Sequence, residues 1–203
     1  MGLSAEDRRL VSAAIHAAEA RTEGEIVCVL AESSAEATPL AILVAALAAL
    51  ALPWLLMGLS QLPVVQILAL QVVLFVGLMA LLFLPRVRVA LLPRATRRAM
   101  AHRAAMEQFL RRGIGRTRGH TGILIFVSLA ERYARIVADE AIASRVAQAE
   151  WQAAVDALTG HLGEGRIGQG FIEAIERCGA VLARHFPASA DKPNQLPDRI
   201  YLV

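Results

Sequence analysis

Two adjacent acids, Asp139 and Glu140, have the type and position that best suit chemistry. They follow "YARIVA", residues 133–138, a run whose alternation of large and small side chains predicts a strand. Sheet edges open into clefts, and carboxylates there could act as catalytic groups or hold a divalent cation for phosphate ester hydrolysis. The same acids would also suit the first turn of a helix, whose N-terminal end is positive. Both interpretations remain open at this point.

His120 is the second candidate, since it directly precedes "TGILIFVSL", a run as apolar as an interior strand. Such a histidine could be a metal ligand or a general base, or only a solvated loop residue. No Ser, His and Asp constellation can be picked out, and the remaining histidines have no carboxylate at ligand spacing: His16, His102, His161 and His185.

The stretch "GEGRIGQG", residues 163–170, contains the spacing GxGxxG. A dinucleotide site requires a strand before this spacing, whereas a helix is predicted here, so we expect an interhelical loop. Arg166 within it could contact an anion or be an exposed loop charge. No cofactor is predicted from these motifs. The acids at 139 and 140 could hold a divalent cation.

Two features bear on the cellular compartment. Cys28 and Cys178 lie far apart and form no CxxC motif, which predicts two buried, reduced thiols. Residues 1–36 are polar and mixed in charge, unlike a secretory signal. We therefore expect the polar parts of the chain to stay in the cytoplasm.

An uncharged block, residues 37–85, accounts for most of the 56% apolar composition. Crossing about 30 Å of hydrocarbon takes about 20 helical residues, so 49 residues suit two spans and a turn. We predict spans at 39–59 and 64–84, with Pro53 as a kink that membrane helices tolerate. The alternative, two long buried helices of a soluble protein, would need more covering chain than the remaining residues supply.

Ten arginines in residues 86–118 follow this block, opposed by a single acid. Positive charge beside a span marks the cytoplasmic side, and it also suits anionic headgroups. Without interleaved aromatic residues or a known motif, no nucleic-acid partner is predicted. The arginines expected to face lipid headgroups are Arg86, Arg88, Arg94, Arg97 and Arg98.

The polar regions read as an α/β domain in two pieces, residues 1–36 and 86–203, separated by the hairpin at 39–84. Helical spacing is present over 5–21, 95–112 and 140–161, and again around 171–186. Apolar runs at 25–31, 123–129 and 133–138 predict strands, and the tail "LPDRIYLV" is short and apolar at its end and could dock on their sheet. One strand cannot form a stable sheet alone. If the strand at 25–31 pairs with the strands after residue 122, both pieces must lie on one side of the membrane. Two spans permit this, and both termini are then cytoplasmic.

Several segments together resemble the TPM domain family, in its bacterial membrane-protein branch. They are "TEGEIVCVLAESS", "TGILIFVSLAERYARIVADEAI", "EWQAAVDAL", "GQGFIEAIERCGAVLARHFP" and "NQLPDRIYLV". The resemblance implies a small α/β sandwich, with a mixed sheet flanked by helices. A thylakoid-lumen relative is described as an acid phosphatase, and other relatives are accessory factors of membrane complexes. Many of these relatives are exported, whereas this domain is divided by a membrane hairpin.

These observations favour a multi-pass inner-membrane protein whose cytoplasmic domain docks on other membrane proteins or assists their assembly. The alternative is a membrane-bound, metal-dependent phosphatase that uses Asp139 and Glu140. The bilayer is a predicted partner in both cases. A homo-oligomer is a further hypothesis, based on small residues that let helices approach closely: Ala41, Ala45, Ala48 and Ala49.

Overall fold

The structure is a computed structural model that describes residues 3–33, 38–84, 87, 92–189 and 194–203. The chain forms two compact units. One contains residues 1–32 and 101–203 and is an α/β domain; the other contains residues 33–100 and includes a helical hairpin. Each unit is described by itself below.

The α/β domain is built on a mixed four-stranded sheet of order β3-β2-β1-β4. Strand β1 (Glu25–Ala31) pairs in parallel with β2 (Gly122–Ser128) over its whole length, and in parallel with β4 (Ile200–Leu202). Strand β3 (Tyr133–Ala138) pairs with β2 in antiparallel orientation. The predicted sheet is confirmed, including the pairing of the strand before the apolar block with the strand after it, and the docking of the C-terminal tail.

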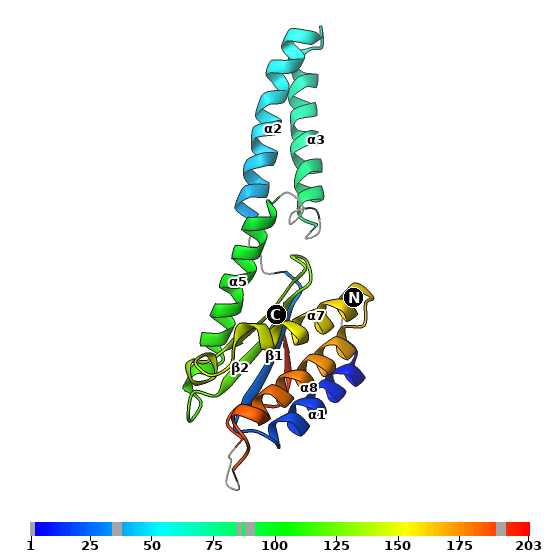
Figure 1. Cartoon of the computed structure of the whole chain (residues 1–203). Helices are drawn as coiled ribbons and strands as arrows, with labels where there is room; N and C mark the ends of the chain where they lie inside the picture. Colours follow the sequence, from blue (N-terminus) through cyan, green and yellow to red (C-terminus); the bar gives the residue numbers. More distant parts are fainter. Residues whose placement is uncertain (1–2, 34–37, 85–86, 88–91, 190–193) are drawn as a thin grey trace. The chain divides into compact units, whose positions relative to one another are not determined.

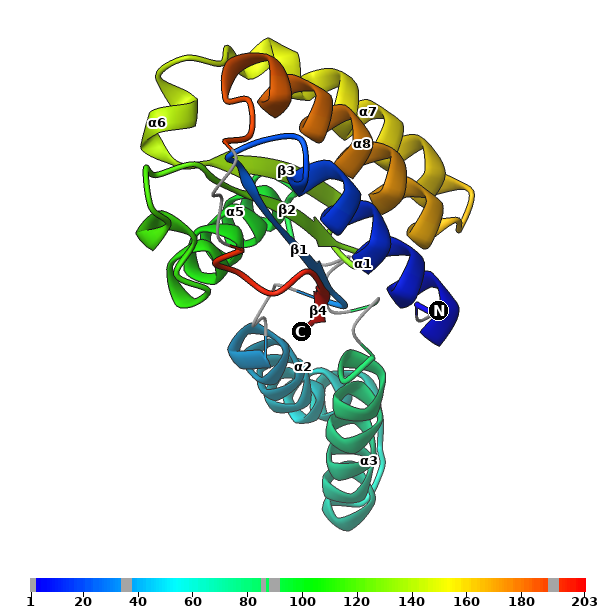
Figure 2. The same ribbon diagram turned by 90° about the horizontal axis from the view of Figure 1, so that it is seen from below.

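Helices cover both faces of this sheet (Figure 2). Alternate side chains of β1 point to opposite faces, as strand geometry requires. Ile26, Cys28 and Leu30 join the larger core under α1 (Ala5–Glu19), α7 (Gln148–Gly163) and α8 (Ile167–His185). The opposite face packs against α5 (Arg94–Arg111), through a smaller core of these buried residues: Val27, Val29, Ala31, Ala105, Phe109, Ile114, Leu124 and Phe126.

Local signals explain where α1 begins and where α5 ends. Ser4 and Asp7 form a capping box at the start of α1: the Ser4 Oγ accepts from the Asp7 N–H at 3.0 Å, and the Asp7 carboxylate accepts from the Ser4 N–H at 3.1 Å. Gly113, with a φ of 67°, lies two residues past the end of α5 and precedes a short 3₁₀ helix, η1 (Ile114–Arg116).

One helix predicted over residues 140–161 is wrong, because the structure has two. Helix α6 (Glu140–Ala143) is a single turn, and α7 begins only at Gln148. Ile142 and Trp151 are both buried in the larger core. At about 100° per residue, a continuous helix would point these two side chains in opposite directions. The break between α6 and α7 lets both reach the core.

The second unit contains α2 (Thr38–Leu59) and α3 (Val64–Leu82), which run side by side as a hairpin (Figure 1). Ala41 and Ala45 near the start of α2 pack against Leu82 at the end of α3, so the chain enters and leaves the hairpin at the same end. The predicted fold class, an α/β mixed sheet with an inserted pair of apolar helices, is confirmed. Of the alanines expected to let helices approach closely, Ala41, Ala45 and Ala49 are buried and Ala48 is half-buried. A homo-oligomer stays a prediction.

Candidate functional site

Asp139 lies at the junction of β3 and α6, where it caps the helix. Its Oδ1 accepts a hydrogen bond from the Glu140 N–H at 2.8 Å, which satisfies the first N–H group of the helix. Glu140 is exposed in the first turn of α6. The structure therefore gives both acids a role in starting the helix, which was one of the two interpretations of this pair.

The other carboxylate oxygen of Asp139 faces His120. The distance from Asp139 Oδ2 to His120 Nδ1 is 3.3 Å, and this oxygen is buried with no hydrogen bond to any described residue. The Asp139 side chain is 11% exposed, whereas that of His120 is 61% exposed. The structure thus brings together two residues that sequence reasoning had considered separately.

Strand register explains why these two residues meet. Ile123 of β2 lies opposite Ala138 of β3, and the Asp139 N–H donates to the Gly122 carbonyl at 2.9 Å. His120, two residues before Gly122, is thereby placed beside the end of β3. It adopts a φ of 55°, a left-handed conformation that non-glycine residues seldom adopt. Backbone of this kind clusters at functional sites, which makes the pair worth testing.

A buried carboxylate facing an exposed imidazole can orient the ring. With Nδ1 directed at Asp139, the Nε2 atom of His120 is left to exchange a proton or bind a ligand. Arg116 and Arg118, two exposed arginines from the same loop, have no ion pair with any described residue. Among the described residues, no three His, Cys, Asp or Glu side chains gather as a metal site, so Asp139 and Glu140 have no third ligand there.

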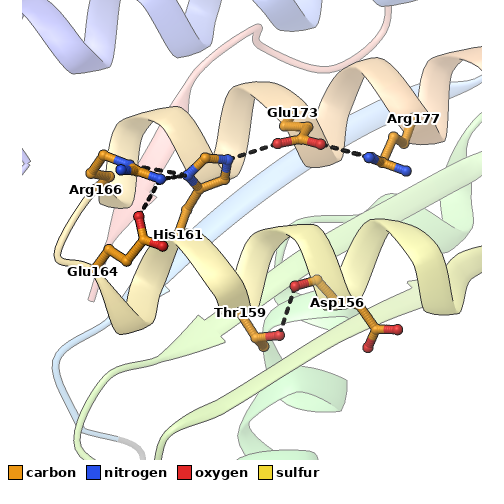
Figure 3. Close-up of polar contacts among 7 residues, drawn as sticks. All are labelled: Asp156, Thr159, His161, Glu164, Arg166, Glu173 and Arg177. Carbon is orange, nitrogen blue, oxygen red and sulfur yellow. Dashed lines mark hydrogen bonds and ion pairs between the residues drawn. The ribbon is translucent and has the colours of Figure 1, made fainter.

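A second polar group joins the end of α7 to α8 (Figure 3). His161 Nε2 lies 2.7 Å from Glu173 Oε2, and Arg166 Nε donates to His161 Nδ1 at 3.2 Å. Since a guanidinium can only donate, Nδ1 is the acceptor and Nε2 carries the proton given to Glu173. Hydrogen bonds from Arg177, and then from His161, hold the pKa of the Glu173 carboxyl below its usual value.

This polar group includes Arg166 and so shows what the stretch at residues 163–170 does in the fold. The stretch does connect two helices, but α8 already begins at Ile167, so the loop is shorter than predicted. Arg166 pairs with Glu164 and His161 rather than standing free for an anion. Gly168 and Gly170 both lie within α8. A Cβ at position 168 would press on the Asp7 side chain, and one at position 170 would press on the Leu158 carbonyl. Close packing therefore explains both glycines.

The two cysteines are buried thiols of the α/β domain, as predicted. Cys28 of β1 and Cys178 of α8 both contribute to the larger core. Burial raises the pKa of the Cys178 thiol to about 12 and also raises the pKa of Cys28. The nucleophilic thiolate form of each is therefore disfavoured.

Most of the exposed large apolar side chains of the described chain lie on the hairpin. Two stretches, Ala41–Leu59 and Val64–Leu82, are long and apolar enough to cross a membrane. In the most apolar 18-residue segment of each, only 11% and 6% are buried, respectively. A core helix of a soluble protein would be mostly covered. Instead Trp54 is 81% exposed, Val65 77% and Val73 68%. Surfaces of this size call for an apolar partner, and the hairpin is consistent with membrane insertion.

Three of the five arginines expected at the lipid headgroups lie among the described residues. Arg94 and Arg98 are exposed on α5, and Arg97 on the same helix is half-buried. Arg86 and Arg88 lie outside the described residues. Their role at headgroups stays a prediction.

Part of the chain matches a known domain, and the whole chain resembles a solved structure in its fold. It resembles the NMR structure of the BA42 protein from the psychrophilic bacterium Bizionia argentinensis, with a TM-score of 0.63 and 20% sequence identity over 100% of this chain and 97% of that chain. At this identity the likeness concerns the fold alone. No curated protein matches the chain. Residues 85–181 match the TPM domain, which confirms the predicted resemblance at the level of that domain.

Proposed function

We propose that this chain is an integral protein of the bacterial cytoplasmic membrane, whose TPM-like domain docks on other membrane proteins as an accessory or assembly factor. The observation that carries the proposal is the exposed hairpin of α2 and α3. In the most apolar 18-residue segments of these two helices, only 11% and 6% are buried. In water, such a surface would drive aggregation; in lipid, it is the expected exterior of a membrane anchor.

The same side of the membrane must hold both pieces of the α/β domain. Strand β1 precedes the hairpin and β2 follows it, and the two pair over seven residues. The hairpin allows this because its first and last turns pack together. Ten arginines follow the second apolar helix, whereas the turn at residues 60–63 has no charge. By the positive-inside tendency, the domain and both termini then face the cytoplasm.

A docking role is supported by apolar side chains on the outer face of α5. Met106 and Leu110 lie one helical turn apart and are 38% and 71% exposed. Apolar positions spaced by four residues form one stripe on a helix, which is a common way for a helix to meet a partner. We assign this stripe, Met106 and Leu110, as the contact for another membrane protein.

Chemical crosslinking in intact cells, followed by purification in detergent, tests the docking role. The same membrane proteins should be recovered reproducibly with the full chain, and their yield should fall in Met106→Glu/Leu110→Glu. Leu10→Glu is the matched control, since Leu10 is 52% exposed on α1. A fusion of the hairpin to an unrelated soluble domain reports background. Recovery of nothing beyond that background would refute the docking role while leaving membrane insertion intact.

A second candidate function is phosphate ester hydrolysis, favoured by one observation: Asp139 Oδ2 lies 3.3 Å from His120 Nδ1. A carboxylate and an imidazole could move protons in that reaction, and the arginines of the same loop suit a phosphoryl group. Asp139 and Glu140 would supply oxygen ligands if a divalent cation takes part.

The purified full chain, assayed on generic phosphoesters with and without magnesium, tests this second function. Both His120→Ala and Asp139→Asn should abolish turnover above background, since each keeps the fold but breaks the pair. His16→Ala is a control at another exposed His–Asp contact, with Asp198 at 3.0 Å. Equal activity in all four proteins would rule out catalysis at this pair.

A further inference from the structure

Tyr201 of β4 is flanked by two guanidinium groups. The Cζ of Arg112 lies 3.5 Å from the centre of the Tyr201 ring, and the Cζ of Arg199 lies 4.7 Å from it. The two charges are therefore no more than about 8 Å apart. Arg112 directly follows α5, and Arg199 directly precedes β4, so residues from distant parts of the sequence meet at this edge of the sheet.

The position of Tyr201 is set by the sheet. It lies opposite Val29 in the register of β1 and β4, and it packs at the margin of the smaller core. Because β4 is an edge strand, the ring is half-buried and its stacked arginines remain accessible. Stacking on an aromatic face holds a guanidinium in place. Its N–H groups, which lie in the plane of the guanidinium itself, stay free to donate.

Neither guanidinium is neutralised by an acid of the described chain. The Arg112 Nε donates to the neutral Gln108 Oε1 at 3.3 Å, and neither Arg112 nor Arg199 has an ion pair with a described residue. Arg177 and Arg184 of the same domain, by contrast, pair with Glu173 and Glu150. Two like charges held against one ring without a counterion leave a strongly positive site.

We propose that Arg112, Arg199 and Tyr201 form a binding site for a phosphate-bearing anion, which we call the arginine–tyrosine site. Two guanidinium forks match the oxygen atoms of a phosphate, and the Tyr201 hydroxyl adds a further donor. A phosphate could come from an anionic lipid headgroup or from a soluble phosphate monoester. The site lies wholly within the α/β domain, so it does not depend on the membrane anchor or on the proposed docking.

Simple packing is the competing explanation, since a single arginine often stacks on an exposed tyrosine to cover it. That explanation accounts for Arg112, whose ring contact is the closer one and whose Nε is held by Gln108. It does not account for a second guanidinium on the same ring, because the second adds repulsion between like charges. A bound anion would offset that repulsion, and the test below separates the two explanations.

The full chain in an uncharged detergent provides the test. Inorganic phosphate and glycerol phosphate are titrated by calorimetry at constant ionic strength, and binding of dihexanoyl phosphatidylglycerol is compared with dihexanoyl phosphatidylcholine by native mass spectrometry. The site variant is Arg112→Gln/Arg199→Gln. The matched control is Arg132→Gln/Arg135→Gln, which removes two exposed charges at the opposite edge of the same sheet. Circular dichroism checks that each variant folds.

We expect at least one phosphate probe to bind, with an affinity reduced about tenfold or more in the site variant and less than about twofold in the control, since hydrogen bonds between charged groups are the strong ones. Tyr201→Phe should retain most of the binding and Tyr201→Ala should lose it, because the ring is the platform. Binding of phosphatidylglycerol alone identifies a lipid headgroup; binding of the soluble probes identifies a phosphate monoester. Failure of every probe to bind wild type, or equal loss in the site and control variants, would overturn the proposal.

Discussion

Two arginines placed in the middle of α3 should prevent that helix from spanning the membrane. Val72 and Val76 are 62% and 58% exposed and lie near the centre of Val64–Leu82. Phe83 and Leu84 are similarly exposed, at 65% and 53%, but lie just beyond the end of the same helix. The double variants Val72→Arg/Val76→Arg and Phe83→Arg/Leu84→Arg therefore change charge equally at equally exposed positions.

The expected cost follows from the composition of α3. Its thirteen Val, Ile, Leu and Phe residues favour insertion by about 4 to 8 kcal/mol in total, at about 0.3 to 0.6 kcal/mol each. Each central Val→Arg change costs about 3 kcal/mol, so two changes cancel most of that gain. At the end of the helix an arginine can reach the headgroups, and the cost is small. In water, all four changes would be worth only about 0.5 kcal/mol or less each.

A fluorescent protein that matures only in the cytoplasm, fused after Val203, reads out the result. Wild type and Phe83→Arg/Leu84→Arg should fluoresce in a carbonate-resistant membrane fraction. In Val72→Arg/Val76→Arg, α2 would cross alone and carry the C-terminus to the other side, so fluorescence should be lost. If that variant fluoresces as brightly as wild type, or if all three proteins remain soluble, the hairpin does not span the membrane.

Three smaller predictions concern the α/β domain, each measured on the full chain in an uncharged detergent. Gly179→Ala should lower the free energy of unfolding by about 1 to 3 kcal/mol, because its Cβ would lie 2.8 Å from the Cβ of Ala18; Gly160→Ala, with nothing within 4 Å, should raise it by about 0.5 to 1 kcal/mol in denaturant titrations. Asp139→Ala should cost about 1 kcal/mol through loss of the N-cap, and Asp139→Asn much less; an equal loss in thermal unfolding would contradict the capping role. Burial raises the pKa of Cys178 from 9.0 to about 12, so the unfolded chain loses this proton at a lower pH than the folded chain. The stability that this thiol contributes should therefore be constant below pH 9 and fall between pH 9 and 12. That fall should be smaller in Cys178→Ala.

Local patterns in the sequence were sufficient to predict most elements of this protein, although not the break between α6 and α7. The apolar run at Glu25–Ala31 and the alternating run at Tyr133–Ala138 are strands with the predicted bounds. Ser4 and Asp7 cap α1 as their spacing indicates. The uncharged block predicts the apolar hairpin because length and hydropathy are properties of the chain itself, independent of any distant contact. The pairing of β1 with a strand beyond the apolar block was also predicted, since a single strand needs a neighbour; the structure shows that this neighbour is β2.

Only the tertiary structure decided which side chains meet. Asp139 reaches His120 because the β2–β3 register places them side by side, and a shift of one residue would turn Asp139 to the other face. Arg112 reaches Tyr201, 89 positions later in the sequence, because a strand formed at the end of the chain docks beside β1. Such convergence depends on strand order and register, which are set by long-range packing. By itself, therefore, the sequence determined an α/β domain carrying an apolar hairpin, whereas sheet order decided where its charges gather.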